Sequence, residues 1–510
     1  MDYLLGIDIG TYESKAVLTD RDGTIVARSS RGHDLSILHP GWAEADADEI
    51  WWHDFVLLAR ELLDRSSVDP ADILAICPSA IGPCVLPVDQ SGLPLRPAIM
   101  YGIDTRATAE IAEINRELGE DWILKNTGSE LSSQAAGPKI LWIRRNEPDV
   151  WKRTARIMTS TSYLVFRLTG RVIIDHYTAA AYGPLYNLHT LEWDPRALEL
   201  VCEKEMLPEL GWSAEQAGTV SSKAATETGL LEGTPVSVGT ADAGAEATAA
   251  GALHTGDTML MYGSTHFFIQ ICEKLVSTDK LWPTVYLEPG SFALAAGMST
   301  TGALTRWFRD NFADREVQGE KEGGINAYQT LFEEASKVPR GANGLLALPY
   351  FSGERSPIND PWARGAIFGL TLSHSRPHLY RAFLESIAYG IRHNLETMQK
   401  AGASPGRLVA IGGGVQSDLW TQIVSDVTGR EQYVHATPGA SFGDCMIASV
   451  TAGMAEKLSD RLDWVGEGEI ARPSPVAHSF YNTQYPLFLA LYEQTKHLSQ
   501  TLARDQSGDH

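Results

Sequence analysis

The chain opens on Tyr3-Leu4-Leu5-Gly6-Ile7-Asp8-Ile9-Gly10-Thr11, an apolar run that ends in an acid, a glycine and a hydroxyl. Residues 3–9 predict a β-strand, and Gly10-Thr11 predicts a tight turn at its end. Residues 14–18 and 24–28 continue the pattern as two further short strands. The opening therefore predicts a β-meander.

Helical spacing follows the meander. Apolar residues over 46–63 recur as on one face of a helix, and apolar runs at 73–76 and 85–88 predict further strands. Strands followed by helices indicate an α/β architecture with a mostly parallel or mixed sheet.

A second segment resembles the opening about half a chain later. Thr258–Tyr262 and residues 266–271 predict two strands, joined by the small-residue turn Gly263-Ser264-Thr265. This short repeat predicts two domains, each opening with a hairpin whose tip faces a shared cleft. We expect an N-terminal domain over 1–248, a C-terminal domain over 249–490 and a C-terminal tail over 491–510, which is polar and frayed from Asp505.

Bulk composition limits the functional class. A chain of 510 residues is too long for one hydrophobic core, and 44% hydrophobic with 21% charged residues is the balance of an ordinary globular enzyme. The net charge of −22 repels phosphate backbones and anionic lipid, which argues against nucleic-acid and membrane partners but not against a nucleotide substrate.

Cysteine spacing and apolar run length point to a reducing compartment. The five cysteines show no Cys-x-x-Cys spacing, so neither a zinc site nor a disulfide framework is indicated. We see no signal peptide and no apolar run of membrane-spanning length, and therefore expect a cytoplasmic protein.

The opening string can also carry chemistry. The turn amides of Gly10 and the hydroxyl of Thr11 can donate to phosphate oxygens, where glycine permits close approach. Asp8, at the end of the strand, could hold a hydrated magnesium ion, and Lys15 could add charge nearby. An ordinary hairpin with a turn glycine is the alternative interpretation.

Asp242 stands between small residues in Gly239-Thr240-Ala241-Asp242-Ala243-Gly244-Ala245. Small neighbours let a ligand approach closely, and the alanine-rich continuation predicts a helix whose N-terminus favours an anion. A simple helix N-cap is the alternative.

Two glycine strings lie near the C-terminus. Ile411-Gly412-Gly413-Gly414-Val415-Gln416-Ser417 predicts a turn between strand and helix that could cradle a nucleotide, although neither a dinucleotide fingerprint nor a P-loop spacing is met. Gly439-Ala440-Ser441-Phe442-Gly443 fits the elbow of serine hydrolases, but Thr437-Pro438 before it predicts a loop, so a plain helix start is favoured.

Taken together and in order, from about residue 3 to about residue 490, these strings resemble the FGGY family of carbohydrate kinases. The strings that carry the resemblance are Gly6-Ile7-Asp8-Ile9-Gly10-Thr11, Gly41-Trp42-Ala43-Glu44, residues 239–242, Gly263-Ser264-Thr265, Ser352-Gly353-Glu354-Arg355-Ser356-Pro357, Phe368-Gly369-Leu370, and Gly412-Gly413-Gly414 with Ser417 and Trp420.

The resemblance implies two ribonuclease H-like domains of the actin and hexokinase superfamily, closing on a central cleft. Sugar would bind mainly to the N-terminal domain and ATP mainly to the C-terminal one. Asp242 matches the general base, and Asp8 matches the acid near Mg²⁺, with Asp242 close by. The implied ATP contacts are Asp8, Gly10, Thr11, Lys15, Gly263, Ser264, Thr265, Gly412, Gly413, Gly414 and Ser417.

Within the family the pattern is most similar to the xylulokinases, with one departure. Where those enzymes carry Gln-Met-His-Gly, this chain has Ser79-Ala80-Ile81-Gly82, which we call the wall segment. Ala80 and Ile81 should form a less polar sugar wall, suited to a different ketose, a polyol or a deoxy sugar. Asp104 and Arg106 are further candidates for binding the sugar, with a surface ion pair as the alternative. Asp175 and Glu354 are two more sugar-side candidates.

The sequence therefore predicts a kinase that uses ATP and Mg²⁺ to phosphorylate a hydroxyl of a ketopentose or a related sugar or polyol. A sugar- or nucleotide-sensing protein on the same fold is the alternative from another class. Kinases for pentitols, tetritols, glycerol or hexonates also stay open. Kinases of this fold are often homodimers, although no stretch of this sequence locates an interface.

Overall fold

The N-terminal sheet is built on the predicted meander. In the computed structural model, which describes residues 2–435 and 437–507, β1 (Tyr3–Ile9), β2 (Glu13–Asp20) and β3 (Ile25–Gly32) are antiparallel neighbours. β6 (Ile73–Ala80) joins β1 in parallel. The seven-stranded sheet is completed by β15 (Pro235–Ser237), β14 (Gln216–Thr219) and β16 (Thr240–Ala241), in the order β14-β15-β6-β1-β2-β3 with β16 beside β6.

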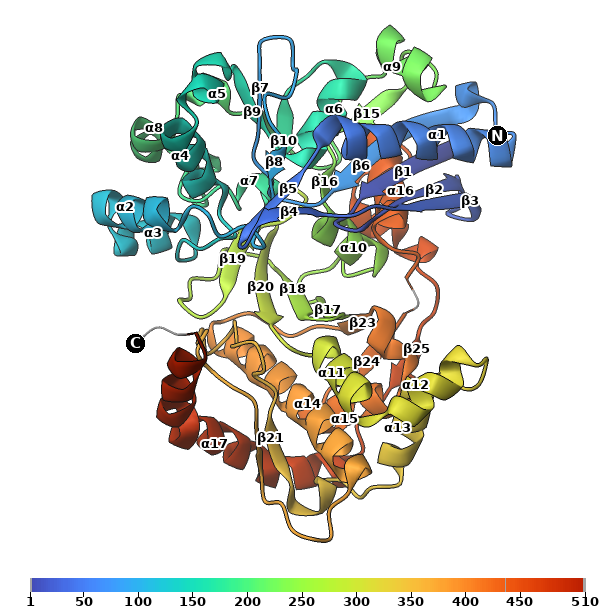
Figure 1. The fold of residues 1–510 in the computed structure, drawn as a ribbon. Helices are drawn as coiled ribbons and strands as arrows, with labels where there is room; N and C mark the ends of the chain where they lie inside the picture. The colour runs from blue at the N-terminus through green and yellow to red at the C-terminus, as the bar shows by residue number, and fades with distance from the viewer. Residues whose placement is uncertain (1, 436, 508–510) are drawn as a thin grey trace.

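The C-terminal sheet repeats this topology, so the predicted internal repeat is confirmed. Its antiparallel strands are β17 (Thr258–Tyr262), β18 (His266–Cys272), β20 (Phe292–Met298) and β19 (Trp282–Val285). β23 (Leu408–Ile411) and β24 (Gln432–Val434) then run parallel to β17, with β25 (Glu469–Ala471) at the edge. Two α/β bodies of the ribonuclease H-like type result, one above the other in Figure 1.

Helices cover both sheets and add a helical subdomain to the N-terminal body. The helix predicted over 46–63 begins as a π-helical turn (Ala47–Trp52) and continues as α1 (His53–Ser66). The subdomain has its own apolar core and contains α2 (Thr108–Leu118), α3 (Glu120–Thr127), α4 (Ala136–Asn146), α5 (Pro148–Arg153) and α8 (Pro195–Val201). The C-terminal body contains α11 (Gly302–Phe312), α12 (Asp314–Lys321), α13 (Ala327–Ser336), α14 (Arg376–Lys400), α15 (Asp418–Thr428) and α17 (Pro475–Ser507).

One helix of the second half packs on the first sheet. α16 (Ala440–Thr451) contacts β1, β2, β6 and α10 (Asp242–Ala249). Two glycines permit this approach: a Cβ on Gly6 would lie 2.0 Å from the carbonyl oxygen of Ser441, and a Cβ on Gly443 would lie 1.9 Å from that of Ala245. The two halves therefore share a core through α16.

Two local predictions near the C-terminus have different outcomes. Gly439 leads directly into α16 without a preceding strand, so the plain helix start is confirmed. In the expected tail, residues 491–507 continue α17 to Ser507, with Leu491 and Ala503 buried. Residues 508–510 lie outside the described residues.

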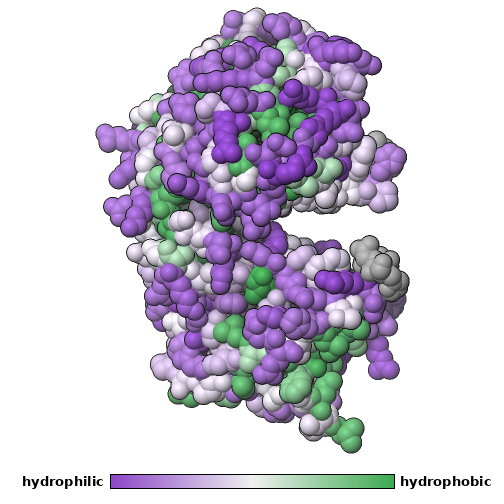
Figure 2. All heavy atoms as spheres, turned by 90° about the vertical axis from the view of Figure 1, so that its left-hand side faces the viewer, coloured by the Kyte–Doolittle hydropathy of each residue, from purple (hydrophilic) through white to green (hydrophobic). Residues whose placement is uncertain are grey.

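The face drawn in Figure 2 is mostly polar and is hollowed between the two bodies. Among residues 2–435 and 437–507 we find no helix with both the length and the apolar content of a membrane span.

Candidate active site

Three strands of the N-terminal sheet end at the same place. β1, β6 and β16 run parallel, and their register sets Asp8 opposite Ser79 and Ala80 opposite Ala241. Asp242 follows β16 directly. Ligands of open α/β sheets bind at the carboxyl ends of strands, and here those ends bring Asp8, Ala80 and Asp242 together.

Asp242 is the first residue of α10 and does not cap it. The N-cap position is held by Ala241, which has no capping side chain. The backbone N–H of Ala243 donates to Oδ1 of Asp242 at 2.8 Å, and we find no other hydrogen bond to this carboxyl among the described residues. Burial raises the pKa of Asp242 to about 6.

Asp8 lies in an acidic environment. Burial raises the pKa of Asp8 well above its usual range, and the charges of Asp242 and Glu246 raise it further. Lys15 opposes this effect, but it is half-exposed and also pairs with Glu13 at 3.2 Å. Three carboxyl groups against one lysine leave an excess of negative charge at the strand ends.

This excess suits a divalent cation. Mg²⁺ binds through one or two carboxylates and completes its shell with water and substrate phosphates. We find no cage of three or more His, Cys, Asp or Glu side chains in the part of the chain that the structure describes. Asp8 and Asp242 are therefore the residues that fit a hydrated Mg²⁺.

Sequence reasoning missed Ser79 and Asp444. The hydroxyl of Ser79 lies 2.7 Å from Oδ2 of Asp444 and 3.1 Å from Oδ1 of Asp8, so it bridges the two carboxyl groups. Asp444 is fully buried on α16. In the sequence, Asp444 could have been noticed as a single acid within the otherwise apolar helix that follows Gly443.

Glu246 was also missed. It follows Asp242 by four residues on α10, which places the two carboxyl groups on one helix face. Burial raises the pKa of Glu246, the charge of Lys15 opposes this rise, and the charge of Asp242 adds to it.

The first hairpin (residues 9–13) carries Gly10 and Thr11 at its tip. The N–H of Gly10 donates to the carbonyl of Glu13 at 3.2 Å. Behind the tip, Nε2 of His33 lies 3.1 Å from the Gly10 carbonyl, and Nδ1 of His33 lies 3.0 Å from Asp54. His33 thereby connects the hairpin tip to Asp54 of α1.

Tyr101 belongs to the same place and was not among the predicted residues. Its pKa is raised to about 12, first by burial and then by the charge of Asp242, while a hydrogen bond with Thr11 opposes the rise. Arg355 of the C-terminal body feels the charge of Tyr101 in turn. Tyr101 therefore lies where the two bodies face each other.

The second hairpin (residues 262–266) carries Gly263, Ser264 and Thr265. The last two side chains are exposed. The N–H groups of Thr301 and Ala303 donate to the carbonyl of Ser264 at 3.2 and 2.9 Å. Main chain from the start of α11 thus supports this hairpin.

Glu354 lies close to this support. Its Oε1 accepts hydrogen bonds from the N–H groups of Ser299 (2.7 Å) and Arg355 (2.8 Å). Burial raises the pKa of Glu354 to about 7. The residue holds the loop after β20 in the C-terminal body, and its sugar-side role stays a prediction.

The glycine turn follows β23, beside the second hairpin. Met261 of β17 pairs with Ile411 of β23, so the turn starts next to the hairpin. Gly412 adopts a φ of +94°, and a Cβ there would lie 2.9 Å from the Tyr262 carbonyl oxygen. A Cβ on Gly413 would meet nothing within 4 Å. Gly413 therefore presents bare backbone to open space.

The other two predicted residues of the turn are engaged in packing. A Cβ on Gly414 would lie 2.8 Å from the Trp420 ring. Ser417 is the N-cap of α15, and its hydroxyl accepts the N–H of Trp420 at 3.3 Å.

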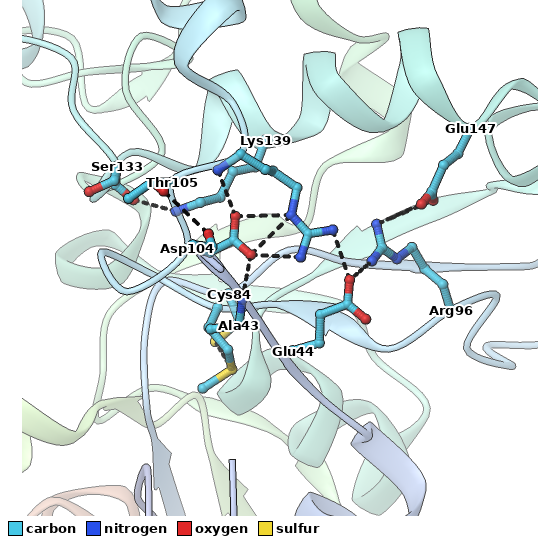
Figure 3. Close-up of polar contacts among 12 residues, drawn as sticks. Ala43, Glu44, Cys84, Arg96, Asp104, Thr105, Ser133, Lys139 and Glu147 are labelled. Carbon is cyan, nitrogen blue, oxygen red and sulfur yellow. Dashed lines mark hydrogen bonds and ion pairs between the residues drawn. The ribbon is translucent and has the colours of Figure 1, made fainter. Parts of the chain in front are cut away.

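Asp104 and Arg106 form a buried ion pair, so the surface alternative is wrong, and the sugar-side role stays a prediction. The Arg106 side chain is fully buried, lies 2.6 Å from Asp104 and 2.8 Å from Glu44, and stacks over the Trp42 ring at 4.0 Å. Figure 3 shows Asp104, Glu44 and Arg96 in one network, while Lys139 beside it bonds to the Ser133 carbonyl. Burial lowers the pKa of Lys139 to about 8.

Asp175 also has a supporting position. Its Oδ2 accepts hydrogen bonds from the hydroxyls of Thr240 (2.8 Å) and Ser213 (3.1 Å), and its side chain caps α7 (His176–Ala179). Burial raises the pKa of Asp175 to about 6. Because Thr240 belongs to β16, Asp175 orients the strand that presents Asp242.

The wall segment runs beside the strand that carries Asp242. Ala80 and Ile81 are buried, and the N–H of Ile81 donates to the Ile9 carbonyl at 2.9 Å. A Cβ on Gly82 would lie 3.5 Å from Cβ of Ala241. The apolar side chains of Ala80 and Ile81 therefore lie beside Ala241, the residue before the candidate base Asp242.

Comparison with known proteins gives matches over nearly the full length. The models of the FGGY family of carbohydrate kinases match residues 3–249 with the N-terminal domain and residues 258–452 with the C-terminal domain. Xylulose kinase of Bacillus subtilis (strain 168) is 29% identical over 98% of this chain and 99% of its own length. Gluconokinase of the same organism is 28% identical over 99% and 98%. The crystal structure of xylulose kinase from Rhodospirillum rubrum superposes with a TM-score of 0.91 at 32% identity, covering 98% of this chain and 99% of that one.

Proposed function

This chain belongs to the FGGY family of carbohydrate kinases, and we propose that it transfers the γ-phosphate of ATP to a hydroxyl of a ketopentose or a closely related sugar or polyol. It is a sugar kinase with ATP as the phosphate donor. The observation that carries the finer proposal is the position of Asp242. Its carboxyl group has one hydrogen bond, lies at the carboxyl ends of three parallel strands and stands next to Asp8.

Asp242 acts as the general base. As the acceptor hydroxyl oxygen bonds to the γ-phosphorus, its proton passes to the Asp242 carboxylate, and the bond between the γ-phosphorus and the β,γ-bridging oxygen breaks to release ADP. A pKa of about 6 brings this carboxylate closer to neutral operating pH than an exposed aspartate. In such transfers the protein mainly positions the reactants and stabilises charge.

The donor is bound by the second hairpin and the glycine turn. The exposed hydroxyls of Ser264 and Thr265 and the backbone around Gly263 can donate to phosphate oxygens. The bare backbone at Gly413 offers a surface for the adenosine. Asp8, with Asp242 nearby, would hold Mg²⁺, which neutralises phosphate charge when bound.

The wall segment selects the acceptor. Ala80 and Ile81 offer no hydrogen-bond donor or acceptor from their side chains, so an acceptor hydroxyl facing them would lose its partner. A hydroxyl-poor edge of the sugar fits this surface better. Relatives that carry the names xylulose kinase and gluconokinase match over similar lengths, so we base the acceptor class on the wall segment and on the pattern shared with xylulokinases.

A coupled ADP-release assay with ATP and Mg²⁺ tests the proposal. The acceptor panel holds ketopentoses, aldopentoses, pentitols, tetritols, glycerol and hexonates. We expect ADP release that depends on a ketopentose or a pentitol. Release with hexonate or glycerol alone would refute the acceptor class. Binding of sugar without ADP release from any panel member would instead favour the sensing alternative.

A double variant isolates the wall segment. Ala80→Met with Ile81→His restores the string found in xylulokinases, and we expect it to raise the relative kcat/KM for D-xylulose by about tenfold or more, as a buried polar contact does. Ala71→Met with Asp72→His, at the surface turn before β6, serves as the matched control. An unchanged acceptor preference in the first double variant would remove the wall segment from specificity.

A further inference from the structure

A cavity of about 310 Å³ lies in the C-terminal body away from the residues described above. Its walls come from the end of α14, the end of α15, β18 and the start of α17, with Gln270, Arg392, Glu396, Thr428, Arg430 and His478 as its polar lining. The volume is at the lower end of the range for small-molecule sites. The cavity can therefore take a molecule of sugar-phosphate size.

The cavity and the glycine turn occupy opposite ends of the same strands. Gln270 is paired with Thr258, the first residue of β17, and Thr258 is paired with Leu408, the first residue of β23. The glycine turn follows the last residue of β23. Four residues of strand separate the two ends by about 13 Å. A ligand in the cavity would thus not overlap with the nucleotide.

Arg430 is the feature that gives the cavity a charge. Its guanidinium donates a hydrogen bond to the carbonyl of Gly406, and we find no carboxylate within ion-pair distance of it among the described residues. The adjacent Glu431 pairs instead with Arg472, at 3.3 Å. Burial is the only cause that shifts the pKa of Arg430, and it lowers it.

The other charged side chains do not cancel this cation. Glu396 lies 2.8 Å from Arg392 and 3.9 Å from Lys400, so two cations share this single carboxylate. Arg392 also donates to the Val427 carbonyl at 3.1 Å. In a chain of net charge −22, a recess with surplus positive charge stands out against the surrounding field.

His478 adds a further group on the opposite wall. Its Nδ1 lies 2.9 Å from the carbonyl oxygen of Asp426, which can only accept, so Nδ1 carries the hydrogen. Its Nε2 has no hydrogen bond among the described residues. When the ring is protonated, Nε2 can donate to an anion in the cavity.

We propose that this cavity is a second small-molecule site, which binds an oxyanion of phosphate-ester or carboxylate type through Arg430, with Arg392 and His478 alongside. Guanidinium groups bind both kinds of oxyanion through paired N–H donors. The site is independent of the catalytic cleft and of the identity of the acceptor sugar.

Isothermal titration of the full-length protein tests the proposal. Saturating non-hydrolysable ATP analogue and Mg²⁺ first occupy the catalytic cleft, and inorganic phosphate, glycerol 3-phosphate and malate are then titrated separately. We expect at least one of them to bind, and the comparison decides between phosphate and carboxylate. Absence of binding by all three at millimolar concentration would overturn the proposal, as would displacement of the probe by more ATP analogue.

Variants locate the bound anion. Arg430→Gln should weaken binding by about tenfold or more, because it removes the unpaired cation, whereas Arg430→Lys should retain part of the affinity. Arg340→Gln removes an exposed arginine of the C-terminal body that does not line the cavity and should leave affinity unchanged. Equal affinities of the wild type and Arg430→Gln would place the anion elsewhere and overturn the proposal. Melting temperatures without the anion verify that each variant is folded.

Discussion

The two sheets share the order of their five central strands but carry different chemistry at the strand ends. In the N-terminal sheet, the ends of β1 and β16 present the carboxyl groups of Asp8 and Asp242. In the C-terminal sheet, the corresponding end of β23 presents glycines, and the neighbouring hairpin presents hydroxyls. The fold thus sets where ligands meet the protein, while the residues at the strand ends decide which ligand each half binds.

The two hairpins are also supported differently. The titratable side chains of His33 and Asp54 support the first, whereas main-chain N–H groups of residues 301–303 and the Thr301 hydroxyl support the second. Support by titratable side chains depends on protonation, and support by main-chain groups and a hydroxyl does not. The comparison therefore predicts different responses of the two halves to mutation and pH.

Removal of the acid from the N-terminal sheet should have the largest effect. Asp242→Asn keeps the shape of the side chain but cannot accept the proton, so kcat should fall by about 100-fold or more while ATP binding is retained. Steady-state assays with the preferred acceptor give the comparison. Asp279→Asn, an exposed aspartate of the C-terminal body, is the control and should keep full activity. Retained turnover in Asp242→Asn would remove the residue from its role.

Substitution of Gly6 should weaken the packing of α16 on β1. A Cβ there would lie 2.0 Å from the Ser441 carbonyl oxygen, so Gly6→Ala should cost about 1–3 kcal/mol of unfolding free energy, as overpacking does. Gly319→Ala on α12, where a Cβ meets nothing within 4 Å, should be neutral or slightly stabilising. Urea denaturation measures both. Equal stabilities would mean that α16 is not held closely on β1.

Loss of the Thr265 hydroxyl from the second hairpin should weaken the use of ATP. Thr265→Ala removes one exposed hydroxyl, so KM for ATP should rise by about two- to tenfold, the value of one hydrogen bond, with little change in KM for the acceptor. Thr11→Ala, at the first hairpin, is the matched variant and should affect the acceptor as well, because Thr11 contacts Tyr101 beside Asp242. A change confined to acceptor KM in Thr265→Ala would reverse the assignment of the two hairpins.

The smallest effect should be a pH dependence at the first hairpin. The hydrogen bond with Asp54 raises the pKa of His33 above 6.5. Burial alone would raise the pKa of Asp54, but the hydrogen bonds from His33 and Ser14 lower it. The stability from His33 is full below about pH 6.5 and is lost as pH rises through its raised pKa, while that from Asp54 is lost as pH falls through its lowered pKa.

A His33 variant checks this window. The difference in unfolding free energy between wild type and His33→Gln should be larger at pH 6 than at pH 9. His189→Gln, whose imidazole contacts only a main-chain carbonyl, is the control. A difference that does not change with pH would mean that His33 carries no charge-dependent contact.

Local features of the fold and site could be predicted from the sequence, and long-range ones could not. Both hairpins and the glycine turn depend on neighbouring residues, so Gly10, Gly263 and Gly412 could be recognised as turn residues. The contact of Ser79 with Asp444 joins positions 365 residues apart and leaves no local pattern.

The burial of individual polar side chains and of the C-terminal segment could not be predicted from the sequence either. Arg106 could be a surface residue by its sequence, but the Trp42 ring and Glu44 enclose it in three dimensions. Similarly, α17 continues past 490 because tertiary packing of Leu491 and Ala503 outweighs the polar composition of the tail.

Calorimetric titration of ATP into Gly413→Leu and Asp242→Asn tests the division of labour between the two sheets most directly. The introduced leucine side chain would extend from a backbone position that faces open space, so the fold should be kept while the adenosine surface is covered. We predict that ATP affinity falls by about tenfold or more in Gly413→Leu and changes little in Asp242→Asn. Unchanged affinity in Gly413→Leu, or an equal loss in both variants, would contradict the assignment of nucleotide binding to the C-terminal sheet.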